Sequence, residues 1–146
     1  MNKCQKKSLI LVIFQMITMI YLIMFNSPFA IRFGLMTQIF GIAIGVWGIL
    51  IMGVGNFNIQ PEVKSYLLIT AGPYKWIRNP MYMAVILFYV PIVIQNFSLM
   101  NVLVFIVLFI AILLKIYSEE QFLEEQFGDK YLKYKRRTKR LIPFIY

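Results

Sequence analysis

Four long apolar stretches dominate this sequence, at residues 8–25, 33–55, 81–95 and 99–117. A helix rises about 1.5 Å per residue, so about 20 residues are needed to cross the hydrocarbon layer of a membrane. The first, second and fourth stretches meet that requirement. The third has 15 residues and contains Pro91, which removes a backbone hydrogen bond and predicts a bend. We expect this third span to be short, tilted or extended by interfacial residues.

The composition points to a membrane as the solvent of these stretches. Apolar residues make up 60% of the 146 residues, and charged residues only 14%. A soluble domain of this size has too little interior to bury so much apolar surface. We therefore predict an all-α, polytopic membrane protein with about four transmembrane helices and a cytoplasmic C-terminal amphipathic helix. A single integral-membrane domain is expected over residues 1–146, with its motif-bearing catalytic part at residues 56–146.

The first apolar stretch follows three lysines, which is also the pattern of a secretory signal peptide. Its apolar part is longer than the core of a typical signal peptide, and residues 27–30 form a poor cleavage site. A helix that is retained in the protein is the favoured interpretation.

The distribution of positive charge predicts the orientation. The N-terminus carries three Lys or Arg residues, the first loop one and the second loop three. The third loop has none, and Lys115 together with the tail supplies eight. This alternation fits the positive-inside rule with both termini cytoplasmic. The second loop and the tail would then face the same compartment, where a cytosolic cofactor can reach both.

Two residue counts limit the chemistry. The chain has no histidine and a single cysteine, Cys4. Intramolecular disulfides, cysteine-built metal sites, histidine-ligated zinc or haem, and Ser-His triads are therefore excluded. The remaining candidates are carboxylates, lysine, arginine, tyrosine and backbone groups, and we expect no metal.

Three glycines of the second apolar stretch, Gly41, Gly45 and Gly48, lie three or four residues apart. Glycines at that spacing allow two helix backbones to approach closely. We predict close packing on a neighbouring helix and assign these glycines no chemistry.

The second loop reads GPYKWIRNPMY and predicts a helix start. Asn79 is placed as N-cap and Pro80 as first helical residue. Free N–H groups and the positive end of the helix dipole at such a start favour a carboxylate or phosphate. The alternative is an interfacial belt, in which Trp and Tyr mark the membrane boundary. The surrounding basic and aromatic residues are Tyr74, Lys75, Trp76, Arg78 and Tyr82.

The segment after the fourth stretch combines acidic, aromatic and basic residues. Lys115 and Glu119 are four apart and share a helical face, as do Glu120 and Glu124, and Gly128 is a predicted C-cap. A solvated amphipathic helix with surface ion pairs is the structural alternative. Residues 130–140 then hold seven cations interleaved with two tyrosines, which predicts binding to anionic lipid headgroups rather than to nucleic acid.

From residue 56 onward the sequence resembles the isoprenylcysteine carboxyl methyltransferases and their phospholipid methyltransferase relatives. The matching pieces are NFN at residues 56–58, Gln60, LLITAGPYKWIRNPMY, and EE..L...FG.KY..YK.R.....P. They cover about three fifths of the chain, and their order and spacing after a glycine-rich span make the combination fairly specific. The resemblance implies an all-helical membrane enzyme that uses S-adenosyl-L-methionine.

The resemblance also implies a set of site residues. Lys115, Glu119 and Glu120 would be catalytic, with Lys115 meeting the substrate and Glu119 also completing the cofactor pocket. The other cofactor-binding positions implied are Gln60, Tyr66, Leu67, Leu68, Ile69, Tyr74, Arg78, Asn79, Pro80, Met81 and Tyr82.

Two positions depart from the family's pattern. Asn79 stands where the family usually has histidine, and Lys115 stands where it has the substrate-side arginine. Asn79 still caps a helix and donates a hydrogen bond, so we expect cofactor binding to survive. Lys115 keeps the charge but loses the bidentate geometry with which arginine recognises a carboxylate.

The predicted reaction is methyl transfer from S-adenosyl-L-methionine to a lipophilic acceptor that arrives from the bilayer. A dry pocket favours it because a sulfonium and an anionic nucleophile neutralise each other, and the protein must align the reacting atoms. We expect the Asn79 helix start to hold the methionyl carboxylate, Glu119 to bind hydroxyl or ammonium groups, and Lys115 to orient the acceptor.

Several readings of the acceptor and of the function stay open. An isoprenylcysteine carboxylate leads, and a phospholipid amine or a small lipophilic thiol is the alternative. A dinucleotide-binding reductase of the sterol type and a non-enzymatic polybasic membrane anchor are the more distant interpretations.

Overall fold

The computed structural model describes residues 3–53 and 68–142. These residues form five α-helices and one short 3₁₀ helix and contain no strand, which confirms the all-α prediction for the described part of the chain. The helices are α1 Lys3–Met24, α2 Phe33–Met52, α3 Pro80–Gln95, α4 Leu99–Phe127 and α5 Asp129–Arg137, with the 3₁₀ helix η2 at Gly72–Lys75.

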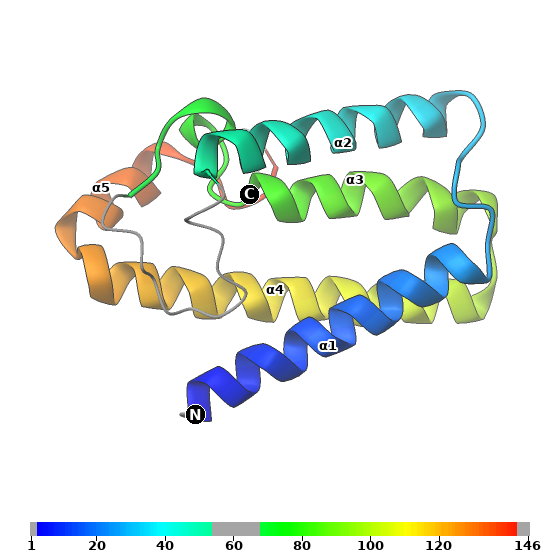
Figure 1. Ribbon diagram of the computed structural model, residues 1–146, viewed down its shortest axis with the longest axis horizontal. Helices are drawn as coiled ribbons and strands as arrows, with labels where there is room; N and C mark the ends of the chain where they lie inside the picture. The colour runs from blue at the N-terminus through cyan, green and yellow to red at the C-terminus, as the bar shows by residue number, and fades with distance from the viewer. Residues whose placement is uncertain (1–2, 54–67, 143–146) are drawn as a thin grey trace.

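Helices α1 to α4 alternate in direction along one bundle axis (Figure 1). The starts of α1 and α3 and the ends of α2 and α4 therefore lie at one end of the bundle, together with η2 and α5 (Figure 1). Helix α2 packs mainly on α3, and α1 packs mainly on α4. The short connections at residues 25–32 and 96–98 favour an antiparallel order of the helices that they join.

The glycines of α2 form the interface with α3. A Cβ atom at Gly41 would lie 3.0 Å from the carbonyl oxygen of Ala84, and one at Gly45 would lie 3.2 Å from the Ala84 Cβ. Neither glycine can gain a side chain without displacing α3, so the predicted close packing is confirmed at this pair of helices.

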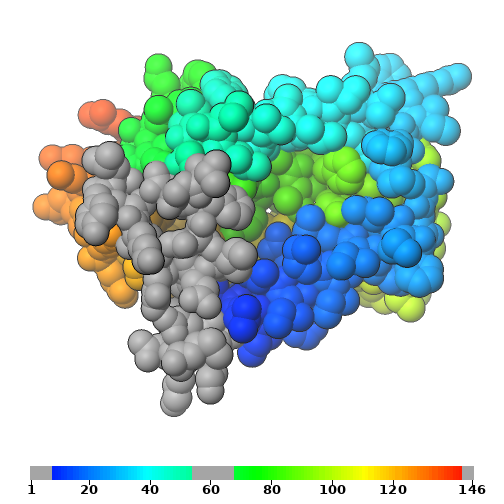
Figure 2. Space-filling model, viewed as in Figure 1, coloured from blue at the N-terminus to red at the C-terminus, as the bar shows by residue number. Residues whose placement is uncertain are grey.

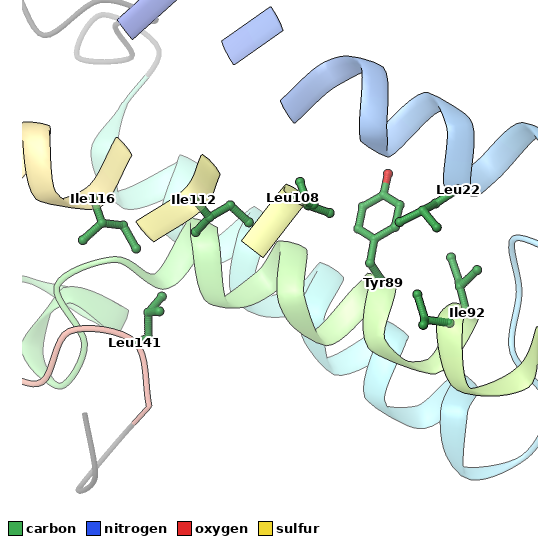
Figure 3. Close-up of a cluster of buried hydrophobic side chains, with 8 residues drawn as sticks. Leu22, Tyr89, Ile92, Leu108, Ile112, Ile116 and Leu141 are labelled. Atoms are coloured by element: carbon green, nitrogen blue, oxygen red, sulfur yellow. The ribbon is translucent and has the colours of Figure 1, made fainter. Parts of the chain in front are cut away.

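The apolar core joins α1, α3 and α4 (Figure 3). It also includes Leu141 from the segment after α5, which lies close to Ile116 of α4 (Figure 3). This contact anchors the end of the described chain in the bundle, although that chain segment is largely polar. The buried members of the core are Leu22, Tyr89, Ile92, Val93, Leu108, Ile112, Ile116 and Leu141.

The buried amide of Gln38 fixes the connection between α1 and α2, at the end of the bundle away from η2 and α5 (Figure 1). The side chain of Gln38 is 1% exposed and accepts from the Ala30 N–H at 2.8 Å. Its Nε2 donates to the Pro28 carbonyl at 2.9 Å and to the Phe88 carbonyl at 3.2 Å. The side chain of Gln38 therefore satisfies one N–H and one carbonyl group of the connection inside the molecule.

Two of the four predicted spans have the length and composition to cross a membrane, namely α2 and α4. The apolar helices Ser8–Met24 and Pro80–Gln95 are shorter, so the prediction of four transmembrane helices stays a prediction. Helix α3 continues through Pro91 to Gln95 without a break in helical structure. Helix α4 continues beyond its apolar stretch to Phe127, so the acidic segment prolongs this helix and the separate amphipathic helix is α5.

The outer faces of α1, α2 and α4 carry large apolar side chains that the rest of the molecule leaves exposed, such as Phe14, Leu50 and Leu103. In the space-filling view α1 and α2 form two separate ridges, and α3 is recessed between them (Figure 2). Apolar surface of this extent requires an apolar environment or a partner.

Candidate functional site

Helix η2 lies against the end of α2 and positions the start of α3. Gly72 has a positive φ of 59°, and a Cβ there would lie 2.7 Å from Cγ1 of Ile51. Only glycine satisfies both the conformation and the contact. The ring of Trp76 lies 6.3 Å from the ring of Trp47, which fixes the exit of the loop on the same helix end.

Helix α3 begins as the sequence predicts, with Asn79 at the N-cap position and Pro80 as first residue. The side chain of Asn79, however, makes no capping hydrogen bond. Its Nδ2 donates to the carbonyl of Arg140 at 3.1 Å instead. The prediction of side-chain capping is therefore wrong, because the tail returns to this position and engages the amide group.

Three helices converge on Glu119. Tyr82 of α3 donates its hydroxyl to Oε1 of Glu119 at 2.8 Å, and Nζ of Lys115 lies 3.1 Å from the same oxygen. Lys115 also donates to Oγ of Ser8 in α1 at 2.8 Å. The Lys115 side chain is buried, and the Glu119 side chain is 30% exposed. Lys115 and Glu119 share one face of α4, as their spacing predicts, and Ser8 is a residue of this group that the sequence did not suggest.

Tyr74 places a buried hydroxyl beside this group. The residue is 6% exposed, and its hydroxyl has no hydrogen-bond partner within the described residues. Burial, and next the negative charge of Glu119, raise the pKa of Tyr74 to about 12. The phenol is therefore protonated near neutral pH and keeps an O–H group available to donate. This hydroxyl lies 3.7 Å from where a Cβ of Gly48 would be, so the glycine leaves room in front of it.

Glu120 faces a different set of partners from its neighbour Glu119. Its Oε1 accepts from Nε of Arg78 at 2.9 Å, and its Oε2 accepts from the Arg140 guanidinium at 2.8 Å. The carboxylate is buried, and both of its oxygens bind arginines. This arrangement gives Glu120 the geometry of a positioning residue between the loop and the tail.

Arg78 extends the same connection into α5 and beyond it. Its Nη1 donates to the carbonyls of Lys135 at 3.0 Å and Thr138 at 2.6 Å. The Arg78 N–H donates to the Lys139 carbonyl at 2.8 Å, and the Lys139 N–H donates to the Trp76 carbonyl at 3.0 Å. These backbone bonds form a short parallel bridge that holds the tail along the loop.

Helix α5 also contacts the backbone of Tyr74. The hydroxyl of Tyr134 donates to the Tyr74 carbonyl at 2.7 Å. Tyr131 lies one turn earlier on the same helix and is buried. The tail therefore supports the loop residue whose side chain faces the Glu119 group.

The predicted site residues fall into two groups at one end of the bundle. Tyr82 and Lys115 contact the Glu119 carboxylate, whose charge also acts on Tyr74, whereas Arg78, Asn79 and Glu120 engage the tail. Pro80 and Met81 form the first turn of α3 beside Gly48, and Leu68 and Ile69 are half-buried residues that precede η2. Gln60, Tyr66 and Leu67 lie outside the described residues. Roles in cofactor binding or catalysis stay predictions for all of them.

A half-open cavity of about 380 Å³ lies on the tail side of α4. It contains Glu120 but neither Tyr74 nor Glu119, so it is separate from the group around Glu119. The lining residues are Tyr117, Glu120, Gln121, Glu124, Glu125, Lys135 and Arg140. Among the described residues, no cluster of three or more His, Cys, Asp or Glu is placed to hold a metal ion.

Comparison with known families gives a match to the family described as phospholipid methyltransferase, over residues 29–130. The match covers more than two thirds of the chain and includes Tyr74, Tyr82, Lys115 and Glu119. Ser8 and Arg140 lie outside it. No curated protein matches the chain.

Proposed function

Because this chain belongs to the phospholipid methyltransferase family, we propose that it transfers a methyl group from S-adenosyl-L-methionine to a lipophilic acceptor at the cytoplasmic face of a membrane. The observation that carries the proposal is the convergence of three separate segments on one carboxylate. Tyr82 from α3 and Lys115 from α4 contact Glu119 directly, and the loop residue Tyr74 is near enough for the charge of Glu119 to help raise its pKa.

The proposed topology has α1 to α4 crossing the bilayer and both termini in the cytoplasm. It is supported by the alternating directions of the four helices and by the exposed apolar side chains on α1, α2 and α4. Helix α3 is 16 residues long, about 24 Å, so its ends need the interfacial residues of the loop to complete a crossing. Residues 1–146 would form a single catalytic domain.

The described residues fit the proposed methyl donor, which supplies an electrophilic methyl group on a sulfonium when it is bound. The hydroxyl of Tyr74, which has no hydrogen-bond partner in the described part of the chain, would donate to it, and the partly exposed carboxylate of Glu119 would bind its ammonium or hydroxyl groups. The first N–H groups of α3, which the Asn79 side chain does not cap, would face its carboxylate. Gln60, Tyr66, Leu67, Leu68, Ile69 and Arg78 complete the proposed set.

The environment of Lys115 favours one class of acceptor. Its ammonium group is buried, paired with Glu119 and bonded to Ser8, so the pair is close to neutral as a unit. A carboxylate acceptor would have to compete with Glu119 for that cation, at a large desolvation cost. An un-ionised amine needs no such cation, and its proton has an acceptor in the Glu119 carboxylate. We therefore propose a phospholipid headgroup amine as the preferred acceptor.

An isoprenylcysteine carboxylate is the second candidate acceptor. The order of the motifs at residues 56–82 and 119–143 favours it, since these pieces resemble the carboxyl methyltransferases. The two candidates differ in the chemistry of the product, because a methyl ester is cleaved by alkali and an N-methyl group is not.

The decisive test supplies purified protein with a radiolabelled methyl donor and a total membrane lipid extract. We expect a labelled lipid whose label resists alkali, and alkali-released methanol would favour the carboxylate acceptor instead. Glu119→Gln is the matched inactive variant, and Glu125→Gln on the exposed face of α4 is its control. Absence of labelled lipid with the unaltered protein, under conditions in which it stays folded, would overturn the proposed function.

A further inference from the structure

Helix α5 carries a stripe of exposed cations along one face. Lys130, Lys133, Arg136 and Arg137 are all exposed and are spaced three, three and one residues apart, which places them on one side of a helix. The helix contains a single carboxylate, Asp129, in its first turn. None of these four cations has a role in the proposed methyl transfer.

The opposite face of α5 is buried against the candidate site. Tyr131 and Thr138 are buried, and Tyr134 reaches the Tyr74 carbonyl. Arg78 binds the backbone at Lys135 and at Thr138, at and just beyond the end of this helix. Any interaction that keeps α5 in this position therefore also stabilises the loop that carries Tyr74 and Asn79.

In the membrane orientation given under the proposed function, the stripe would lie near the lipid headgroups. Helix α4 extends ten residues beyond Tyr117, where its apolar stretch ends, which is about 15 Å. The chain then returns along α5 to the backbone bridge between Lys139 and Trp76. The side chain of Trp76 is 50% exposed, and Nζ of Lys75 lies 5.9 Å from its ring centre, an amphipathic pair typical of a membrane interface.

We propose that the exposed face of α5 binds the anionic headgroups of the bilayer in which the protein sits, and that this contact stabilises the loop of the candidate site. The lipid surface would attract the stripe by charge complementarity. The hydrogen bonds of the buried face would then restrict the motion of residues 74–79. The inference rests on the membrane orientation given under the proposed function, but not on the identity of the methyl acceptor.

The test uses the full-length protein in lipid nanodiscs and measures amide hydrogen exchange, which requires neither cofactor nor acceptor. Discs of phosphatidylcholine alone are compared with discs that contain about one third phosphatidylglycerol. We expect exchange in both α5 and residues 74–79 to slow by about threefold or more in the anionic discs, and the difference to shrink in high salt. Failure of methyl transfer would leave this measurement interpretable.

Two variants control for charge and for folding. Lys133→Glu combined with Arg136→Glu should abolish the lipid-dependent slowing, whereas Lys133→Arg combined with Arg136→Lys should retain it. Equal exchange in the two kinds of disc would overturn the proposal. Persistence of the slowing in the charge-reversed variant, or the same slowing by an added oligonucleotide in neutral discs, would do so as well.

Discussion

Lys115 and Ser8 are 107 residues apart in the sequence, yet Nζ of Lys115 donates to Oγ of Ser8 at 2.8 Å. This bond brings α1 into the group around Glu119, although α1 lies outside the part of the chain that matches the family. Ser8 is 2% exposed, so the hydroxyl is an interior acceptor rather than a surface one. Helix α1 is thus connected to the candidate site and is more than an anchor beside it.

Ser8→Ala should therefore weaken the site as well as the fold. The substitution leaves a buried ammonium with one hydrogen bond fewer, which costs about 1–3 kcal/mol in the free energy of unfolding. We also expect lower affinity for S-adenosyl-L-methionine, because Lys115 and Glu119 lose their fixed positions. Denaturant unfolding in detergent and calorimetric titration of the methyl donor measure the two effects. Ser118→Ala is the control, since that hydroxyl donates to the Leu114 carbonyl of its own helix. Equal losses in both variants would contradict the prediction.

Removing one member of the ion pair at Lys115 and Glu119 should harm stability more than removing both. Lys115→Met leaves Glu119 without its cation in a largely apolar environment, and such a loss typically costs about 3–5 kcal/mol for a fully buried pair. Because Glu119 is 30% exposed, we expect the lower part of that range. The double variant with Glu119→Gln should recover part of the loss, although it should not bind the methyl donor. A double-mutant cycle on the free energy of unfolding gives the coupling, and a value of zero would show that the pair contributes nothing.

Tyr74 allows a prediction on pH dependence. Its pKa is raised from 10.0 to about 12 in the folded protein, so between these values the unfolded chain loses a proton that the folded protein retains. The contribution of the protonated Tyr74 phenol to the free energy of unfolding is complete below pH 10. It is lost as the pH rises toward about 12, by up to about 2 kcal/mol. Tyr74→Phe should therefore be less sensitive to alkali than the unaltered protein.

The same variant should separate stability from binding. Near neutral pH, Tyr74→Phe removes a buried hydroxyl that has no partner within the described residues, so the free energy of unfolding should stay equal or rise slightly. Affinity for the methyl donor should nevertheless fall by about tenfold, the worth of one buried hydrogen bond. Unfolding at about pH 8 and pH 11.5, together with titration of the donor, tests both statements. Unchanged affinity would remove Tyr74 from the proposed site.

Glu120→Gln should loosen the tail from the loop. The carboxylate receives charged hydrogen bonds from Arg78 and Arg140, and its neutralisation removes the negative charge that both guanidinium groups bind, a loss of about 2–4 kcal/mol. Trypsin should then cleave α5 faster, because this helix carries four exposed basic residues. Glu125→Gln, an exposed position on the same helix, should leave the rate of cleavage unchanged. Equal rates in the two variants would mean that Glu120 does not fasten the tail.

The sequence predicted those features that depend on neighbouring residues. Asn79 and Pro80 mark the start of α3, and the spacing of Lys115 and Glu119 gives their ion pair, because both signals act within one helical turn. Ser8 gave no such signal, since its partner lies on a distant helix. The sequence also contained no signal that the Arg140 carbonyl lies beside Asn79. The Asn79 side chain donates to this carbonyl and does not make the predicted capping bond. Only tertiary structure decides which distant donor reaches a given acceptor.

The glycines of α2 provide a last prediction, which concerns two positions on one helix. Gly41→Ala would place a Cβ 3.0 Å from the Ala84 carbonyl and from the Leu87 Cβ, so the two helices must separate. We expect a loss of about 1–3 kcal/mol in the free energy of unfolding. At Gly48 the nearest atom to a new Cβ, Cγ of Met81, is 3.5 Å away, an ordinary contact. Gly48→Ala should therefore keep or slightly raise stability, because alanine favours the helix by about 0.5–1 kcal/mol. Unfolding of both variants in the same detergent gives the comparison, and a greater loss at Gly48 would mean that α2 packs on α3 in another register.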